Sequence, residues 1–359
     1  MIKLIKPYIS FDEVESDFKK IFDSGYFTKG VFVEKFRNEI ASYTGAKYAY
    51  LTTSATTALS ISLKAVGVGS GDEVIVSDFS FPATANVVED LGAIPIFADV
   101  DFDTFNMLPE SLASKISKKT KAVIFVDALG NPSGIHKISE ICKEKGIPLI
   151  EDAACAIGSS EFGVKCGNIA DITCFSFHPR KLLTTGEGGA ITFNDSKMVD
   201  FFDVKLNHGS KFENNKFNFI DYGYNYRMSE LQAAMGIVQI KKIDDIVALR
   251  NKMRKQFAKQ LELYGFEIQK VSEGAIHNVQ SLVFKVPKNI IRDKLIAYLK
   301  NIGIESTIGT YCLSGTSYYS KKYNAVQKNA LYLQEQTITL PCYNDLDVLF
   351  VCDKIKEFS

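Results

Sequence analysis

The residues best suited to chemistry surround Lys181. This lysine follows the apolar, β-rich run 172–177 and precedes Gly186, Gly188 and Gly189. The glycines allow the backbone to turn tightly and to approach a ligand closely. An amine held on such a turn, away from bulk water, can lose its proton and attack a carbonyl carbon to form a Schiff base. Lys181 is therefore a candidate nucleophile, and the competing interpretation is a solvated lysine in a surface loop.

Asp152 is the second candidate, because it follows the predicted strand 148–151 and precedes Ala153 and Ala154. The two small residues leave room for a flat ligand. A carboxylate in this position can hold a proton on a heteroaromatic nitrogen through a charge-assisted hydrogen bond. The alternative is an ordinary cap or turn aspartate, and this feature alone does not decide between the two.

Two more strand ends carry suitable groups. The predicted strand 48–52 runs into Thr53-Ser-Ala-Thr-Thr57 at the start of a helix, where backbone amides and hydroxyls favour an anion. The alternative there is a Ser/Thr helix cap without a ligand. Phe81 follows the predicted strand 73–76 and could stack on a planar ring, although a phenylalanine at such a place is more often part of the core.

Taken together, these strand ends offer a nucleophilic amine, a carboxylate, an anion site and an aromatic face. Pyridoxal 5′-phosphate (PLP) needs all four groups: a Schiff-base lysine, an acid partner for its pyridine nitrogen, a phosphate site and a stacking ring. Ser176 lies five residues before Lys181. Counting along a strand does not place the two side chains on one face, so the turn must supply the remaining geometry.

The elements that must position these groups alternate between short β-rich runs and helical patterns from about residue 46 to 152, which is typical of an α/β sheet with crossover helices. We predict strands at 48–52, 73–76, 94–98, 122–126, 148–151, 172–177 and 189–193. We predict helices at 56–66, 83–91, 109–116 and 138–145. Open α/β sheets bind ligands beyond the carboxyl ends of their strands, so the four groups should meet there.

At 359 residues, the chain is long enough for two lobes that share an interface. We predict a large, mostly parallel sheet domain over residues 1–240, including the N-terminal segment, and a smaller α+β domain over 241–359. A long helix is expected from Met228, with Leu231, Met235, Ile237 and Ile240 able to line one side. No repeat or low-complexity linker separates the lobes, so we expect direct packing with the site between them.

Composition argues against several classes of function. Lys plus Arg equals Asp plus Glu at 42 each, which gives no electrostatic footprint for nucleic acid or an anionic membrane surface. The N-terminus lacks a secretory signal and no apolar run has the length of a membrane span, so we expect a cytoplasmic protein. Seven scattered cysteines and four histidines fit neither a disulfide framework nor a metal site.

The sequence resembles the DegT/DnrJ family of PLP-dependent sugar aminotransferases, which have the fold type I architecture of aspartate aminotransferase. The resemblance extends from Gly25-Tyr-Phe-Thr-Lys-Gly30 to Leu340-Pro341. Its most specific motifs are Glu151-Asp-Ala-Ala154, Ser176-Phe-His-Pro-Arg-Lys181, Gly186-Glu-Gly-Gly189 and Gly223-Tyr-Asn-Tyr-Arg-Met-Ser-Glu-Leu-Gln-Ala-Ala234.

This resemblance implies a role for each candidate. Lys181 would hold the cofactor as a Schiff base and then move the proton between the substrate Cα and the cofactor's C4′. Asp152 would keep the pyridine nitrogen protonated, and Phe81 would be the stacking aromatic. The phosphate would be bound by Ser176 and by the backbone of Ala55 and Thr56.

Two further positions follow from the same resemblance. Cys155 stands where the family often has Gln or His near the cofactor's phenolic oxygen, and a thiol is a weaker hydrogen-bonding partner. Asn225 would reach the phosphate of the neighbouring subunit's cofactor, which implies a homodimer with shared sites.

The activity implied is transfer of an amino group from L-glutamate to a keto carbon of a nucleotide-linked sugar, for surface polysaccharide biosynthesis. Two half-reactions through pyridoxamine phosphate would give ping-pong kinetics. Relatives with histidine in place of the lysine perform dehydration, so Lys181 favours transamination. Ser314, where relatives often carry a histidine, motivates a smaller acceptor such as a phosphorylated ketose as the alternative. An alternative of another class is a non-catalytic, PLP-binding regulator or sensor.

Overall fold

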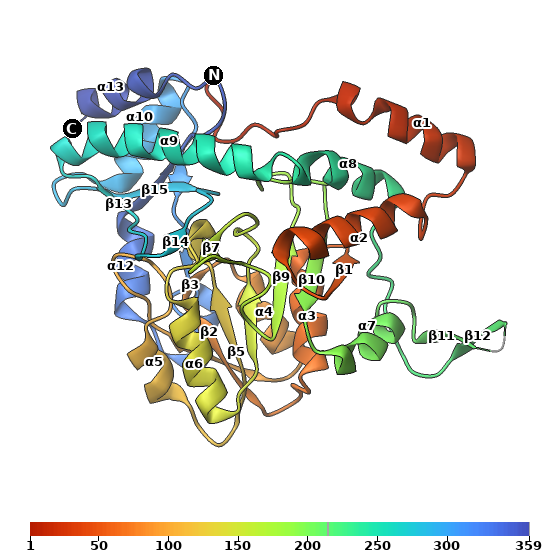
Figure 1. Ribbon diagram of the computed structural model, residues 1–359. Coiled ribbons are helices and arrows are strands. Elements are labelled where there is room, and N and C mark those ends of the chain that lie inside the picture. Colours follow the sequence, from red (N-terminus) through yellow and green to blue (C-terminus); the bar gives the residue numbers. More distant parts are fainter. Residues whose placement is uncertain (214, 359) are drawn as a thin grey trace.

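A seven-stranded sheet forms the centre of the molecule in the computed structural model, which describes residues 1–213 and 215–358 (Figure 1). The strand order is β1-β10-β9-β6-β5-β2-β4. The bounds are β1 Tyr48–Thr52, β2 Glu73–Ser77, β4 Ile94–Ala98, β5 Thr120–Val126, β6 Leu149–Asp152, β9 Ile172–Ser176 and β10 Gly189–Phe193. Strand β10 is antiparallel to β1 and β9, and the other neighbours are parallel. The mostly parallel sheet predicted from the sequence is therefore confirmed.

Helices cover both faces of this sheet. Their bounds are α3 Ala55–Ala65, α4 Ala83–Asp90, α5 Pro109–Lys115, α6 Ile135–Lys145 and α7 Val199–Lys205. Alternate residues of a strand belong to different apolar clusters, as expected for a sheet buried on both sides. In β1, Tyr50 packs with α3 and α7, whereas Ala49 and Leu51 pack in the cluster on the opposite face.

The opposite face near β1 is covered by α2 (Val31–Thr44) and α8 (Glu230–Ile240), which pack against each other. Helix α1 (Glu15–Ser24) precedes α2, and neither of these two helices was predicted from the sequence. The helix expected from Met228 begins at Glu230, after the cap Ser229. Of its four expected apolar residues, Ile237 and Ile240 are buried, whereas Leu231 and Met235 are only partly covered.

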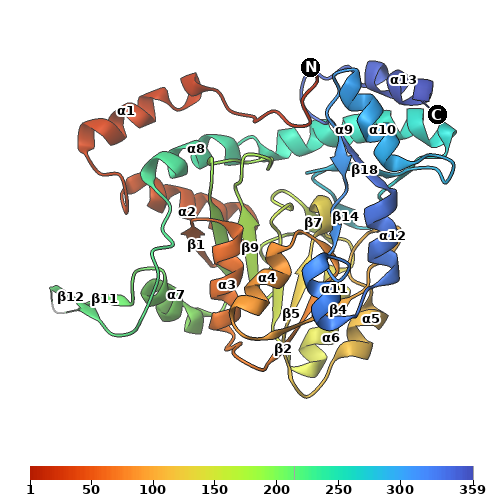
Figure 2. The ribbon, with the colours of Figure 1, turned by 180° about the vertical axis from the view of Figure 1, so that it is seen from behind.

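The C-terminal part of the chain has its own four-stranded antiparallel sheet, in the order β13-β15-β18-β16, and its own apolar cluster. Figure 2 shows this part of the chain, mostly in blue, beside the large sheet. The strands are β13 Glu267–Ile268, β15 Leu282–Lys285, β16 Thr307–Ile308 and β18 Thr337–Leu340. The helices are α9 Ile243–Leu261, α10 Arg292–Asn301, α11 Ser317–Tyr323, α12 Lys328–Gln336 and α13 Val348–Phe358. Ile2 forms a parallel bridge with Ile304, so the first residues lie against this part. The division into domains at 240/241 stays a prediction, and residue 359 lies outside the described residues.

Short strand pairs complete the fold. They are β3 Phe79–Ser80 with β17 Tyr311–Cys312, β7 Ser160–Glu161 with β8 Val164–Lys165 and β14 Ala275–Ile276, and the hairpin β11 Ser210–Glu213 with β12 Lys216–Phe219. The β3–β17 pair joins the end of β2 to the C-terminal part. All seven cysteines are free thiols. Among the described residues, no helix combines the length and the apolar character needed to cross a bilayer.

Candidate active site

A pocket of about 220 Å³ lies where the carboxyl end of the large sheet meets the C-terminal part of the chain. Phe81, Cys155 and Lys181, all singled out from the sequence, line it. Residues from β15, β16, β17 and β18 or their neighbours form the other wall. The two lobes therefore face each other across Lys181.

Lys181 occupies the loop between β9 and β10, which backbone hydrogen bonds close. Phe177 N donates to Gly188 O at 2.9 Å, and Lys181 N donates to His178 O at 2.9 Å. The side chain is partly buried, and its Nζ donates to Cys155 Sγ at 3.0 Å. The amine thus points into the pocket toward the segment that follows β6.

Gln280 holds the backbone on both sides of Lys181. Its Nε2 donates to the carbonyl of Arg180 at 2.6 Å, and its Oε1 accepts the amide of Leu182 at 2.8 Å. The Gln280 side chain is 4% exposed, and its own backbone amide donates to Asn278 Oδ1 at 2.8 Å. Sequence reasoning missed Gln280, since nothing local relates it to a loop 100 residues away.

Asp152, the last residue of β6, is 5% exposed and receives two hydrogen bonds. Thr84 Oγ1 donates to its Oδ2 at 2.8 Å, and Ala154 N donates to its Oδ1 at 3.2 Å. Burial raises the pKa of the Asp152 carboxyl, whereas these two donors and the charge of Lys181 lower it. Thr84, in the first turn of α4, is a second residue that the sequence did not single out.

The N-terminus of α3 presents free backbone donors. Ser54 caps the helix by accepting the amide of Thr57 at 3.2 Å. Within the described residues, no acceptor takes the amides of Ala55 and Thr56. A Cβ added at Gly189 would lie 2.6 Å from the carbonyl carbon of Ser54, so glycine allows β10 to approach this helix end closely.

Ser176 lies next to this helix end, because it pairs with Gly189, and Gly189 pairs with Thr52 at the end of β1. Its side chain is 9% exposed and its Oγ accepts the amide of His178 at 3.4 Å. Counting along the strand did not place the Ser176 side chain. The pairing of β9, β10 and β1 places Ser176 near the start of α3.

Phe81 and Asn225 are both exposed. Phe81 is 65% exposed and lies at the pocket with its ring centroid 6.3 Å from that of Tyr311. Asn225 is exposed and forms a bridge with Asn207, and it does not line the Lys181 pocket of its own chain. Of the predicted residues, Phe81, Cys155 and Lys181 line this pocket, whereas Ala55, Thr56, Asp152, Ser176 and Asn225 are not among its lining residues.

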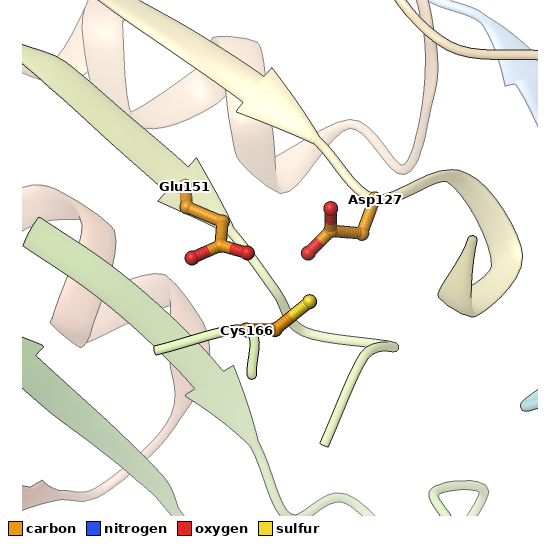
Figure 3. Close-up of side chains that lie close together, drawn as sticks. All are labelled: Asp127, Glu151 and Cys166. Atoms are coloured by element: carbon orange, nitrogen blue, oxygen red, sulfur yellow. The ribbon is translucent and has the colours of Figure 1, made fainter. Parts of the chain in front are cut away.

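A buried acidic cluster lies behind Asp152. Asp127, Glu151 and Cys166 offer ligand-type atoms within 4.8 Å of one another (Figure 3). Within the described chain, both Asp127 oxygens and Glu151 Oε1 lack a hydrogen-bond partner, whereas Thr173 Oγ1 donates to Glu151 Oε2 at 2.6 Å. Burial, followed by the charge of Glu151, raises the pKa of Asp127 well above its usual range. A proton held on Asp127 therefore accounts for two acids in one buried space.

The sheet order, the lysine loop after β9, the carboxylate at the end of β6 and the open helix end at α3 define the class: this is a fold type I, PLP-dependent transferase fold. A family model described as the DegT/DnrJ/EryC1/StrS aminotransferase family matches residues 10–355. The chain belongs to this family and is a PLP-dependent aminotransferase. The fold and family expected from the sequence are confirmed.

Three similar proteins illustrate this relationship. GDP-perosamine synthase of Vibrio cholerae is 31% identical over 94% of this chain and 93% of its own. UDP-2-acetamido-2-deoxy-3-oxo-D-glucuronate aminotransferase of Pseudomonas aeruginosa is 31% identical over 83% of this chain and 81% of its own. The PLP form of the putative sugar aminotransferase Spr1654 of Streptococcus pneumoniae is 25% identical, with a TM-score of 0.93, and the match covers 99% of this chain and 98% of that one.

Proposed function

We propose that this aminotransferase moves an amino group from L-glutamate to a keto carbon of a nucleotide-linked sugar, in two half-reactions with ping-pong kinetics. The observation that carries the proposal is the Lys181 amine inside the pocket, near Asp152 and between the two lobes. Similarity to enzymes named for GDP- and UDP-linked sugars supports the acceptor class.

The residues present fit PLP, on the evidence of their unused donors. We assign the phosphate to the Ala55 and Thr56 amides and the Ser176 hydroxyl, because these amides have no acceptor within the described chain and stand at the positive end of α3. We assign Asp152 to the pyridine nitrogen, since a buried carboxylate favours a protonated partner. Phe81 is assigned to the ring face.

When bound, PLP supplies an electron sink for negative charge that develops at the substrate Cα. In this proposal, Lys181 Nζ holds the cofactor at rest and, once released, moves the proton at Cα. Cys155 Sγ, 3.0 Å from Nζ, orients the amine through its weak hydrogen bond. The closed loop and the Gln280 clamp keep this nitrogen in place through both half-reactions.

The pocket wall opposite Lys181 supports a polyhydroxylated acceptor. Residues that carry hydroxyl groups line this wall, which is built from the C-terminal part of the chain, and they include Ser281, Thr307, Thr310 and Tyr311. Such groups both donate and accept hydrogen bonds, which suits the hydroxyls of a sugar.

Ser314, which motivated the smaller acceptor, is engaged elsewhere. Its side chain is 1% exposed and its Oγ donates to Asp78 at 2.6 Å. The residue therefore makes a structural contact, and no observation at this position favours a phosphorylated ketose.

The test uses purified enzyme reconstituted with PLP. L-Glutamate is expected to bleach the visible cofactor band and to release 2-oxoglutarate, and addition of a nucleotide-linked keto-sugar should restore the band. A panel of nucleotide-linked and free keto-sugars identifies the acceptor. Bleaching without recovery on any nucleotide-linked sugar would contradict the acceptor class, and a band unaffected by glutamate would contradict the donor.

A further inference from the structure

The residues that line the Lys181 pocket carry an excess of positive charge. Among the described residues that line it are three cations, Arg180, Lys181 and Arg250, and no carboxylate. A partly buried cleft of one sign attracts ligands of the opposite sign more strongly than an open surface does. The pocket therefore suits a ligand with an anionic group.

Two of these cations, Arg250 and Lys181, are already engaged by other contacts or by a proposed role in catalysis. Arg250 is 2% exposed, and its guanidinium donates to the carbonyls of Val279, Gln280 and Cys342 and to the Tyr8 hydroxyl. Lys181 donates to Cys155 and is the proposed nucleophile. Arg250 is therefore buried and held by protein acceptors, and Lys181 is reserved for the cofactor.

Arg180 differs from both. Its side chain is exposed at the pocket, and within residues 1–213 and 215–358 its guanidinium has neither an ion pair nor a hydrogen bond. The backbone beneath it is held, because Arg180 N donates to His178 Nδ1 at 3.2 Å and Gln280 Nε2 donates to Arg180 O at 2.6 Å. The planar guanidinium of Arg180 therefore has N–H donors that are unpaired within the described chain, while hydrogen bonds hold its backbone in place. Arg180 directly precedes Lys181, whose amine is the proposed nucleophile.

We propose that Arg180 binds the anionic oxygen group of a substrate, a carboxylate or a phosphate, at the mouth of the Lys181 pocket. A guanidinium matches either group with two parallel hydrogen bonds. The cofactor phosphate does not compete for this site, because Ala55 and Thr56, to which it is assigned, do not line the pocket. The inference rests on the proposed function, and it requires that at least one of the two substrates carry a negatively charged group.

Two sources could supply this anion: the amino donor, through a carboxylate of glutamate, and the acceptor, through a phosphate or a sugar acid. Calorimetric titration of the PLP-loaded enzyme measures the binding affinity of a probe for each source without turnover. Glutarate, which lacks the amino group, serves as the donor probe, and UDP and GDP serve as acceptor probes. The variants are Arg180→Gln and Arg180→Lys, and Lys145→Gln on the exposed end of α6 removes one charge away from the pocket.

We expect Arg180→Gln to weaken at least one probe by about 10- to 100-fold, which is the loss typical of a hydrogen-bonded charge pair. Arg180→Lys should recover part of the loss, and Lys145→Gln should bind as the wild type does. Wild-type affinity for that probe should fall as salt rises, and the dependence should be weaker in Arg180→Gln. If Arg180→Gln loses affinity for glutarate alone, the anion belongs to the amino donor. If it loses affinity for a nucleotide alone, the anion belongs to the acceptor.

Equal affinities of wild type and Arg180→Gln for every probe, with both proteins folded by circular dichroism, would overturn the proposal. Absence of binding of all probes to the wild type would overturn it as well. These results are separate from the fate of the proposed function. An enzyme that glutamate does not bleach, yet whose glutarate or nucleotide binding depends on Arg180, would contradict the donor assignment and retain the anion site.

Discussion

At the scale of single residues, the site depends on how Lys181 and Asp152 are held. Each of these two proposed catalytic side chains has a supporting residue from a distant element: Gln280 for the lysine loop and Thr84 for the carboxylate. Such support limits the motion of the reactive groups, which catalysis by positioning requires.

Lys181→Ala is expected to lower turnover by at least about 10³-fold, because no other amine in the described pocket is free to bond the cofactor or move the proton. The fold should remain, since Lys181 is partly exposed rather than part of the core. Borohydride reduction followed by peptide mapping checks the attachment. Cofactor found on another lysine in the wild type would contradict the assignment.

Thr84→Val is expected to lower kcat/KM by about 10-fold, as the loss of a hydrogen bond to a charged group would. Thr84 lowers the pKa of Asp152, so its removal raises that pKa and makes the carboxylate form harder to keep. The acid limb of the pH–rate profile should therefore move to higher pH. Thr84→Ser keeps the hydroxyl and should restore both values, and an unchanged profile in Thr84→Val would contradict this role.

At the scale of elements, helix ends organise much of the molecule. The open end of α3 faces the site, whereas the N-terminus of α2 is closed by a side chain from α8. Glu230, which is 2% exposed, accepts the amides of Gly30, Phe32 and Val33 at 2.9, 2.9 and 3.0 Å. A carboxylate at this position satisfies the free donors and opposes the helix dipole.

Glu230→Gln is expected to destabilise the protein by about 1–3 kcal/mol, because its amide group supplies one acceptor and no charge to three partly buried donors. Glu34→Gln is the control, because Glu34 lies in α2, the helix whose N-terminus Glu230 caps, and its exposed carboxylate pairs with Arg37. The loss in free energy of unfolding should stay within about 0.5 kcal/mol in this variant. Thermal unfolding followed by circular dichroism compares them. Equal shifts in both variants would exclude the capping role.

At the scale of the whole molecule, one buried acid joins the large sheet to the C-terminal part. Asp78, after β2, accepts hydrogen bonds from the Ser314 amide at 2.7 Å and its hydroxyl at 2.6 Å. Burial raises the pKa of Asp78 to about 6. The folded state therefore binds this proton more tightly than the unfolded state, whose pKa is close to 3.8.

The contribution of Asp78 to stability should thus grow as pH falls from about 6 to about 4, by roughly 3 kcal/mol at most, and should be lost as pH rises above 6. Asp78→Asn removes the titration. The difference in free energy of unfolding between wild type and Asp78→Asn is expected to move in favour of the wild type on acidification across this window. A difference independent of pH would show that Asp78 does not titrate there.

The homodimer that the family resemblance implies can be tested by mixing subunits. If Asn225 completes the partner's site, a heterodimer of Lys181→Ala and Asn225→Ala subunits contains one intact site and one doubly defective site. Unfolding and refolding the two inactive variants together should recover up to about a quarter of wild-type activity. Each variant treated alone is the control, and a mixture as inactive as both controls would contradict shared sites.

Much of the fold could be predicted from local pattern. The bounds of β1, β4 and β10 agree with prediction at every residue, since their apolar, β-branched runs end at polar or glycine residues. Helices α1 and α2 were missed, because mixed charges break their apolar pattern. Their burial depends on packing against α8.

The sequence by itself determined the sheet, the family and the proposed catalytic pair Lys181 and Asp152, because strand periodicity and glycine turns are local and place strand ends at one edge. Only the tertiary structure decided that Gln280 clamps the lysine loop, that Thr84 bonds Asp152, that Ser314 is occupied by Asp78 and that Arg180 is left free. Those facts depend on contacts between segments far apart in the chain. No local periodicity encodes such contacts, since they arise when separate elements bury their surfaces against one another.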